Sequence, residues 1–210
     1  MKAKKIHDIT LEIKADSIVY PNNPVPEISF LRKVPEASST LSKIVLGSHT
    51  GTHVDSLLHV KENGAALEKL PLESFAGECR VLDLAHCKQV TKDELEKHSI
   101  QKNEIILLKT DNSNHSYDKF REDFAHITVD GAQYLAGKKV RTVGVDYLSV
   151  QKFHSGNQTV HLALMEAGIT VFEGLDLRKI KPGKYFFVGL PLKISGIDGA
   201  PCRAILLEIE

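Results

Sequence analysis

Cysteine is scarce in this chain of 210 residues, and none of its cysteines belongs to a CxxC pair. The three residues, Cys79, Cys87 and Cys202, are odd in number and spread along the sequence. This usage argues against a disulfide framework and suits a reducing compartment. Each cysteine is therefore expected to be a small buried hydrophobic residue.

The chain also lacks an excess of charge and any long apolar run. Lys plus Arg and Asp plus Glu number 27 each, so no global field attracts nucleic acid or an anionic membrane. No segment is apolar for long enough to span a bilayer, and the opening MKAKKIHDITLEIKAD lacks the continuous apolar stretch of a secretory signal. A cytoplasmic protein is predicted, with neither nucleic acid nor membrane as a partner.

What is present is the composition of an ordinary soluble domain. Hydrophobic residues make up 42% of the chain and charged residues 26%, which is typical of globular proteins and not of disordered ones. The length fits one domain with a substantial core. No internal repeat, low-complexity tract or long linker marks a boundary, so residues 1–210 are predicted to form a single domain.

Local patterns predict strands at both ends of the chain and alternating strands and helices in its centre. Strands are expected at 5–13, 27–34, 41–47, 80–86, 104–111, 141–147, 169–175, 184–196 and 202–210. Helices are expected at 91–99 and 128–139, capped by Thr91 and Thr128, and at 161–169. This order indicates an α/β fold with a mixed sheet.

The stretch SHTGTHVDSLLHV, residues 48–60, places His49, His53, Asp55 and His59 close together. Such a group can be a metal site, an acid–base relay or a polar loop without chemistry. The residues between the first two histidines are poor helix formers, so a bent loop is predicted, with Gly51 permitting an unusual backbone angle. Asp55 is expected to cap a short helix that carries His59 back toward the others.

Imidazoles combined with a carboxylate favour Zn²⁺, with Mn²⁺ as an alternative. Asp55 has two oxygens, enough to bridge two cations. His161 at a helix start and Glu173 at the end of a buried strand are distant candidates, because ligands collect at strand ends in α/β folds. The remaining histidines are interpreted as surface or loop residues without metal-like neighbours. They include His86, His98, His115, His126 and His154.

The segment HTGTHVDSLLH resembles the HxGTHxDxPxH signature of the putative cyclase family, which includes bacterial kynurenine formamidases and isatin hydrolases. Other segments are similar to the same family: the opening strand with its YPNNP turn, the strands EIILLKT and RTVGVDYLSV, and the C-terminal GLPLKISGIDGAPCRAILLEI. The resemblance therefore covers nearly the whole chain.

The resemblance implies a swivelling β/β/α fold, a homodimer or larger assembly, and a metal-dependent amidohydrolase that cleaves a non-peptide C–N bond. The implied substrate is a small amide, most simply an arylformamide of the N-formylkynurenine type, attacked by hydroxide that the metal supplies. His49, His53 and Asp55 would bind one Zn²⁺. Asp55, His161 and Glu173 would bind a second, and His59 would carry the proton.

Two departures from the family pattern stand out. Leu57 occupies the proline position of the signature, and Tyr20 stands where kynurenine formamidases often place a tryptophan, a residue this chain lacks. Tyr20 still offers an aromatic face for the substrate and adds a hydroxyl. Three alternatives stay open: a hydrolase of a cyclic amide or lactone, a cyclase or dehydratase of the same family, and a non-catalytic metal-binding protein.

Overall fold

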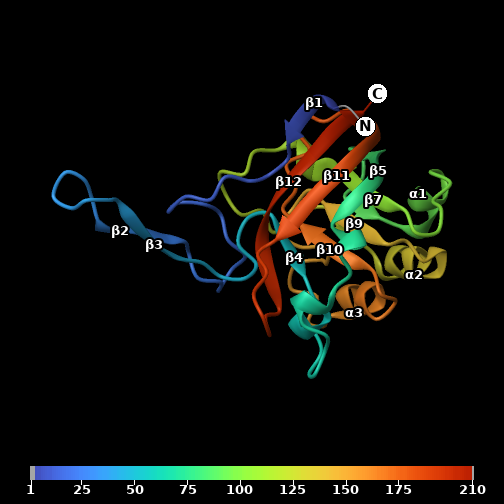
Figure 1. The fold of residues 1–210 in the computed structure, drawn as a ribbon. Helices are drawn as coiled ribbons and strands as arrows, with labels where there is room; N and C mark the ends of the chain where they lie inside the picture. The colour runs from blue at the N-terminus through green and yellow to red at the C-terminus, as the bar shows by residue number, and fades with distance from the viewer. Residues whose placement is uncertain (1–2, 210) are drawn as a thin grey trace.

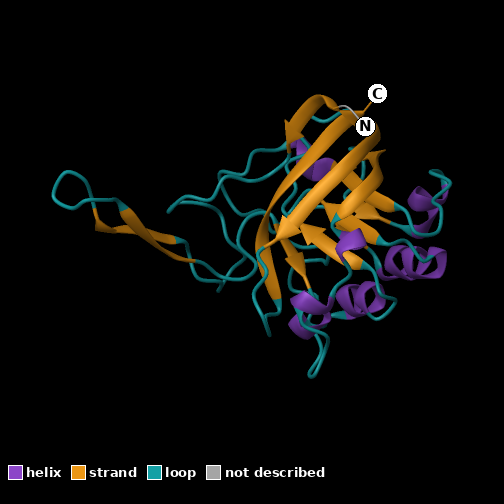
Figure 2. Ribbon diagram, in the orientation of Figure 1, coloured by secondary structure: helices purple, strands orange, loops and turns teal. Residues whose placement is uncertain are grey.

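A computed structural model describes residues 3–209 of the chain (Figures 1 and 2). The main sheet contains β1 (Ala3–Asp8), β4 (His53–Asp55), β5 (Ala76–Leu84), β7 (Ile105–Thr110), β9 (Thr142–Val145), β10 (Thr170–Glu173), β11 (Gly183–Pro191) and β12 (Gly199–Ile209). The α-helices are α1 (Lys92–Glu96), α2 (Val129–Lys138) and α3 (Thr159–Met165). Two smaller sheets pair β2 (Glu27–Arg32) with β3 (Leu41–Val45) and β6 (Gln89–Val90) with β8 (His126–Ile127). Short 3₁₀ helices are η1 (Leu57–His59), η2 (Leu67–Lys69), η3 (Leu72–Ser74) and η4 (Asp111–Asn114).

The strand order of the main sheet is β1-β12-β11-β5-β7-β9-β10-β4. Neighbours among β5, β7, β9 and β10 run parallel, and the other pairs are antiparallel, which confirms the predicted single-domain α/β fold with a mixed sheet. The first residues of β12 also pair with β4. This second pairing closes the sheet on itself and brings β4 and β10 beside β12.

Strand β7 shows why the central strands read as continuous apolar runs. Ile106 and Leu108 pack into the cluster beneath the helices, whereas Ile105 and Leu107 face the cluster enclosed by the sheet. Alternate side chains of a strand point to opposite faces, so a strand covered on both faces needs apolar residues throughout. Burial of each such side chain contributes about 1.5–3 kcal/mol. Figure 2 shows the three α-helices gathered on one side of the sheet.

The predicted helices are present with small shifts. The Thr91 hydroxyl accepts a hydrogen bond from the Glu94 amide, and Thr128 likewise caps α2. Helix α3 begins two residues before the predicted start, which places His161 in its first turn. The predicted cap at Asp55 is wrong: this residue ends β4, and Ser56 precedes η1. In residues 3–209 we find no helix with the length and apolarity that a membrane crossing requires.

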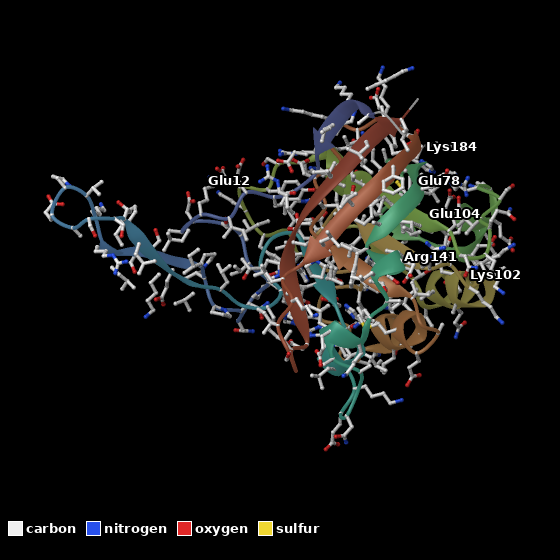
Figure 3. The ribbon with its side chains drawn as sticks, viewed as in Figure 1. Glu12, Glu78, Lys102, Glu104, Arg141 and Lys184 are labelled. Carbon is white, nitrogen blue, oxygen red and sulfur yellow. The ribbon has the colours of Figure 1, made fainter. Side chains whose placement is uncertain are left out.

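The predicted strands near 27–34 and 41–47 exist, but they leave the main sheet. β2 and β3 form a hairpin that projects far from the body of the molecule (Figure 1). Every residue of both strands is exposed, and their side chains stand out on either side of the ribbon (Figure 3). We call residues 25–45 the arm.

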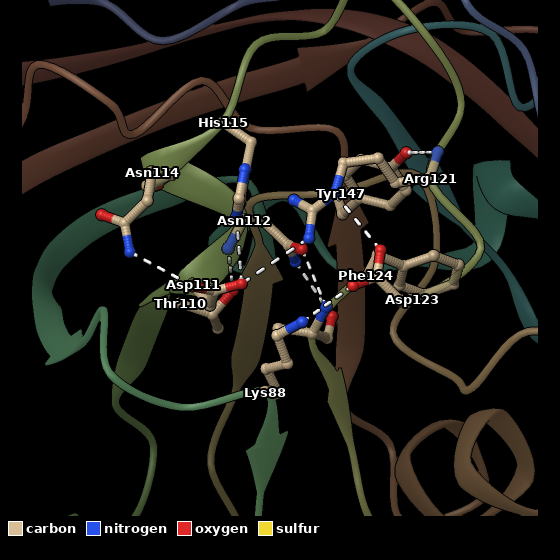
Figure 4. Close-up of polar contacts among 12 residues, drawn as sticks. Lys88, Thr110, Asp111, Asn112, Asn114, His115, Arg121, Asp123, Phe124 and Tyr147 are labelled. Carbon is tan, nitrogen blue, oxygen red and sulfur yellow. Dashed lines mark hydrogen bonds and ion pairs between the residues drawn. The ribbon is translucent and has the colours of Figure 1, made fainter.

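A polar network beside η4 supports an aromatic wall (Figure 4). The backbone amide of Arg121 donates to the Tyr147 hydroxyl at 2.6 Å, and the Tyr147 ring stacks on Phe124 with centroids 4.7 Å apart. Phe120 contacts Tyr147 on one side and Tyr20 on the other, at 5.9 and 5.4 Å. The hydrogen bond from Arg121 thus holds Tyr147 in place, and Tyr147 supports Phe120, the ring that Tyr20 contacts.

Charged side chains of both signs meet where β5 and β11 lie together, as the labelled Glu78, Glu104, Arg141 and Lys184 show (Figure 3). The guanidinium of Arg80 binds both carboxylate oxygens of Glu104 in this region. Positive and negative side chains therefore offset one another on this part of the surface.

Candidate metal centre

Two glycines with left-handed backbones bring the histidine turn against the end of β10. Gly51 has φ +63° and Gly174 has φ +68°. A Cβ on Gly174 would lie 2.3 Å from the Gly51 carbonyl oxygen, so only glycine allows this approach. The Thr52 hydroxyl donates to the Gly174 carbonyl oxygen at 2.5 Å and ties the two segments together.

Strand pairing then aligns the candidate ligands. β4 runs antiparallel to β10, and His53 lies directly opposite Glu173. Asp55 is two residues further along β4, so its side chain shares a face with that of His53. The first turn of α3 adds His161. His49 precedes β4 in the turn and completes the set of five predicted ligands. The fold thus brings together residues as far as 124 positions apart in the sequence, from 49 to 173.

Asp55 divides the centre into two halves. Its Oδ1 lies 2.7 Å from His49 Nδ1 and 3.3 Å from His53 Nε2, whereas its Oδ2 lies 3.9 Å from His161 Nε2. Glu173 joins the halves, with Oε2 3.4 Å from His53 Nε2 and Oε1 3.2 Å from His161 Nε2. The two oxygens of Asp55 therefore face two different groups of ligands.

These spacings fit a divalent cation. Nitrogen and oxygen ligands of a tetrahedral Zn²⁺ lie about 3.3 Å apart, given metal–ligand bonds of about 2.0–2.2 Å. The separations of His53 from Asp55 and of His161 from Glu173 are close to this value. The His49–Asp55 contact is a hydrogen bond at 2.7 Å and has to open before both atoms bind one cation.

Unpartnered polar atoms in the same place also favour a cation. His53 Nε2 and Asp55 Oδ2 are buried, and neither has a hydrogen-bond partner within residues 3–209. The Nδ1–H of His53 donates to the Gly51 carbonyl oxygen at 2.9 Å, which aims Nε2 at the carboxylates. A buried polar atom without a partner costs about 1–3 kcal/mol, and ligation by His53 and Asp55 removes that cost.

The electrostatics of the centre favour positive charge. Burial opposes the charged imidazolium of His53, but the carboxylates of Asp55 and Glu173 outweigh burial and raise its pKa to about 10. Burial likewise opposes ionisation of Asp55, yet the hydrogen bond from His49 and the positive charges of the His49 and His53 rings hold the pKa of that carboxyl well below its usual range. The negative charges of Asp55 and Glu173 thus stabilise a proton on His53, and they would stabilise a metal cation at the same place.

His59 lies at the mouth of the centre. Its ring is 4.0 Å from that of His49 and 5.7 Å from that of His161, and its side chain is 29% exposed. One of its ring nitrogens also lies close enough to a ring nitrogen of His49 and a carboxylate oxygen of Asp55 to form a ligand group with them. The position of His59 is therefore compatible with two roles, proton transfer and metal binding. An experiment that measures metal content and turnover distinguishes them.

Asp198 is the residue that sequence reasoning missed. Its Oδ2 lies 2.7 Å from His49 Nε2 and 3.8 Å from His59 Nδ1, and the Ser48 hydroxyl donates to the same oxygen at 3.2 Å. Its backbone carbonyl accepts from the Ser56 amide and holds the loop in place. The signal available in the sequence was an acid between glycines, in the SGIDGA segment that resembles the family's C-terminal part.

A cavity of about 490 Å³ opens onto the centre, a volume suited to a small molecule. Histidines of the centre form its floor, and Tyr20 and Phe153, whose rings are 5.6 Å apart, form an aromatic side. His154 also lines the cavity. Tyr20 therefore presents an aromatic face to the cavity next to the centre.

His86 is an exposed turn residue, as predicted, but the prediction that it has no metal-like neighbours is wrong. Its Nε2 lies 3.2 Å from Glu94 Oε2, and Cys87 is beside it, so this residue does have metal-like neighbours. The three cysteines are free and buried, as predicted.

The chain was compared with known proteins. The model of the Putative cyclase family matches residues 7–152. A kynurenine formamidase from Salinibacter ruber is 36% identical over 204 residues, which cover 96% of each chain. A solved structure described as a potential metal-dependent hydrolase with cyclase activity is 37% identical, covers 98% of both chains and superposes with a TM-score of 0.88.

An isatin hydrolase A from Labrenzia aggregata superposes with a TM-score of 0.83 over 98% of this chain and 94% of that one. Its identity is 21%, so the likeness concerns the fold. The family match extends over the histidine turn and most of the central strands. Sequence and fold agree, and this chain belongs to the putative cyclase family.

Proposed function

We propose that the protein is a metal-dependent amidohydrolase that cleaves a non-peptide C–N bond in a small amide. The observation that carries this proposal is the buried ligand centre divided by Asp55 and open to a cavity through His59. Its relatives include proteins described as kynurenine formamidases and as a metal-dependent hydrolase.

His49, His53 and Asp55 would hold one cation, and Asp55, His161 and Glu173 a second. Nitrogen and carboxylate oxygen without sulfur suit Zn²⁺, with Mn²⁺ as the alternative. Bound there, a divalent metal supplies hydroxide near neutral pH and polarises the amide carbonyl.

His59 would carry the proton from the attacking water to the departing nitrogen. His59 lies beside both halves of the centre and also lines the cavity. It can therefore contact a substrate that is bound in the cavity. Asp198, near its Nδ1, would orient the ring. In the reaction, water adds to the carbonyl carbon, the C–N bond breaks, and the nitrogen leaves with the proton from His59.

The substrate would be an arylformamide of the N-formylkynurenine type. The aromatic side of the cavity, built from Tyr20 and Phe153, favours a flat ring next to the reacting amide. Cyclic amides of the isatin type and lactones share this chemistry, and Tyr20 adds a hydroxyl that would contact a ring carbonyl.

Hydrolysis of N-formylkynurenine by the purified protein tests the proposal. We expect turnover that disappears after chelation and returns with Zn²⁺ or Mn²⁺. Absence of turnover in protein that retains its metal would remove this substrate and leave cyclic amides and lactones to be assayed. Absence of both metal and turnover would contradict the proposed function.

We propose further that the protein is a homodimer held by the arm. Among residues 3–209, eight of the fourteen exposed large hydrophobic residues lie in it. They are Val25, Ile28, Phe30, Leu31, Val34, Leu41, Ile44 and Val45. An isolated two-stranded hairpin is marginally stable in water. A second copy offers a surface for these residues, since Leu190, Leu192 and Ile194 are exposed beside a groove with both apolar and charged lining residues.

Charge on the arm should therefore dissociate the protein. Ile28 and Ile44 lie opposite each other in the hairpin. We expect wild type to have twice the mass of one chain by light scattering, and the Ile28→Glu/Ile44→Glu double variant to have the mass of one. Leu72→Glu, at a residue 71% exposed outside the arm, is the control and should stay dimeric. A monomeric wild type would refute the dimer.

A cytoplasmic location is also proposed. Three free, buried cysteines suit a reducing compartment.

A further inference from the structure

A second group of metal-binding side chains lies where β5 leads into α1. His86 and Cys87 occupy the turn after β5, and Glu94 is in α1. One ligand atom from each lies within 4.8 Å of the others. None of these residues belongs to the centre around Asp55, and this group contains a sulfur ligand, which that centre lacks.

The distances suit a cation. His86 Nε2 is 3.2 Å from Glu94 Oε2, close to the about 3.3 Å expected between ligands of a tetrahedral Zn²⁺. Lys97 Nζ binds the other oxygen, Oε1, at 2.6 Å. Lys97 thereby neutralises part of the carboxylate charge but leaves Oε2 facing the imidazole and the thiol.

A similar histidine–carboxylate pair elsewhere lacks these features. His115 Nε2 is also 3.2 Å from an oxygen of Asp111, but Arg121 approaches that same oxygen at 3.6 Å. A cation bound there would meet the guanidinium directly, and no third ligand completes that pair in the described residues. The group around Cys87 differs from this pair in two ways. It has a third ligand, and the Glu94 oxygen that faces His86 is not the one that Lys97 binds.

The backbone holds the group ready. The Cys87 amide donates to the Leu84 carbonyl oxygen at 2.7 Å, and the Cys87 carbonyl accepts from the Asp111 amide at 3.2 Å. The Thr91 cap fixes the first turn of α1 and so the position of Glu94. Burial and the neighbouring Glu94 raise the pKa of the Cys87 thiol to about 11, so the thiol keeps its proton until a metal replaces it.

We propose that His86, Cys87 and Glu94 bind one Zn²⁺ or a similar borderline-soft divalent cation, with water as the fourth ligand. On binding, the thiol proton is released to solvent and a sulfur–metal bond forms, with no change of oxidation state. A thiolate, an imidazole and a carboxylate together are a ligand set typical of zinc. The bound cation ties the turn after β5 to α1.

Cobalt is the probe that tests this site, because a thiolate bound to Co²⁺ gives a near-ultraviolet charge-transfer band. Metal-free protein is titrated with Co²⁺ alone, and the band is followed to saturation. We expect wild type to develop a band whose final intensity corresponds to one thiolate-bound Co²⁺ per chain. Cys87→Ser should lose the band, and Glu94→Gln should weaken binding at least about tenfold.

Cys202→Ala is the matched control, since Cys202 is also buried but has no metal-binding partner, and it should keep the band. Cys87→Ser should also retain full amide hydrolysis, which shows that the variant is folded. Absence of the band in wild type, or its persistence in Cys87→Ser, would overturn the proposal. Because the centre around Asp55 has no sulfur, the band reports on this site alone.

Discussion

Alanine in place of His59 is expected to lower kcat for N-formylkynurenine by about 10²–10⁴ while the metal content stays that of wild type. The reason is that His59 stands at the cavity, with its side chain 29% exposed, while the buried ligands remain in place behind it. Loss of a proton carrier slows departure of the nitrogen without removing the cations. Steady-state kinetics and elemental analysis of the same preparation measure both quantities.

His115→Ala, at an exposed histidine outside the centre, is the control and should retain wild-type kinetics. The decisive outcome is the metal content of His59→Ala. His59 also lies within ligand distance of His49 and Asp55, so a variant that loses metal would make His59 a ligand. A variant with full metal and full turnover would leave it without a role in the reaction.

Asn in place of Asp55 is expected to remove metal from both halves of the centre and to lower kcat/KM by about 10³-fold or more, since metal activation is worth several kcal/mol. One oxygen of Asp55 faces His49 and His53, and the other faces His161. The amide is similar in size to the carboxylate but carries no negative charge. Elemental analysis, with a thermal unfolding curve to show that the variant is folded, measures the effect.

His161→Ala gives the contrast, because His161 faces only Asp55 Oδ2 and Glu173. We expect its metal content to fall from about two per chain toward one, as only one half of the centre loses a ligand. Equal loss of metal in Asp55→Asn and His161→Ala would mean that the two halves of the centre bind their cations only together. A wild-type ratio in His161→Ala would refute the second cation.

Sequence patterns determined the features that depend on neighbours along the chain. The apolar run IILL within 104–111 predicted a strand covered on both faces, and β7 is buried on both. Thr91 and Thr128 predicted two helix starts, because a cap acts within one turn. The spacing in residues 48–60 indicated the candidate ligands His49, His53 and Asp55, and Gly51 indicated the bend between them.

Only the tertiary structure decided how distant segments meet. Antiparallel pairing of β4 with β10 sets His53 opposite Glu173, and the β12–β4 pairing brings Asp198 to His49. Such registers arise from packing and hydrogen bonds between strands far apart in sequence, which no local periodicity records. For the same reason the sequence predicted β2 and β3 as strands but not that they leave the sheet as an arm. It also predicted no metal-like neighbours for His86, because Glu94 reaches this residue only after α1 folds back over the turn that follows β5.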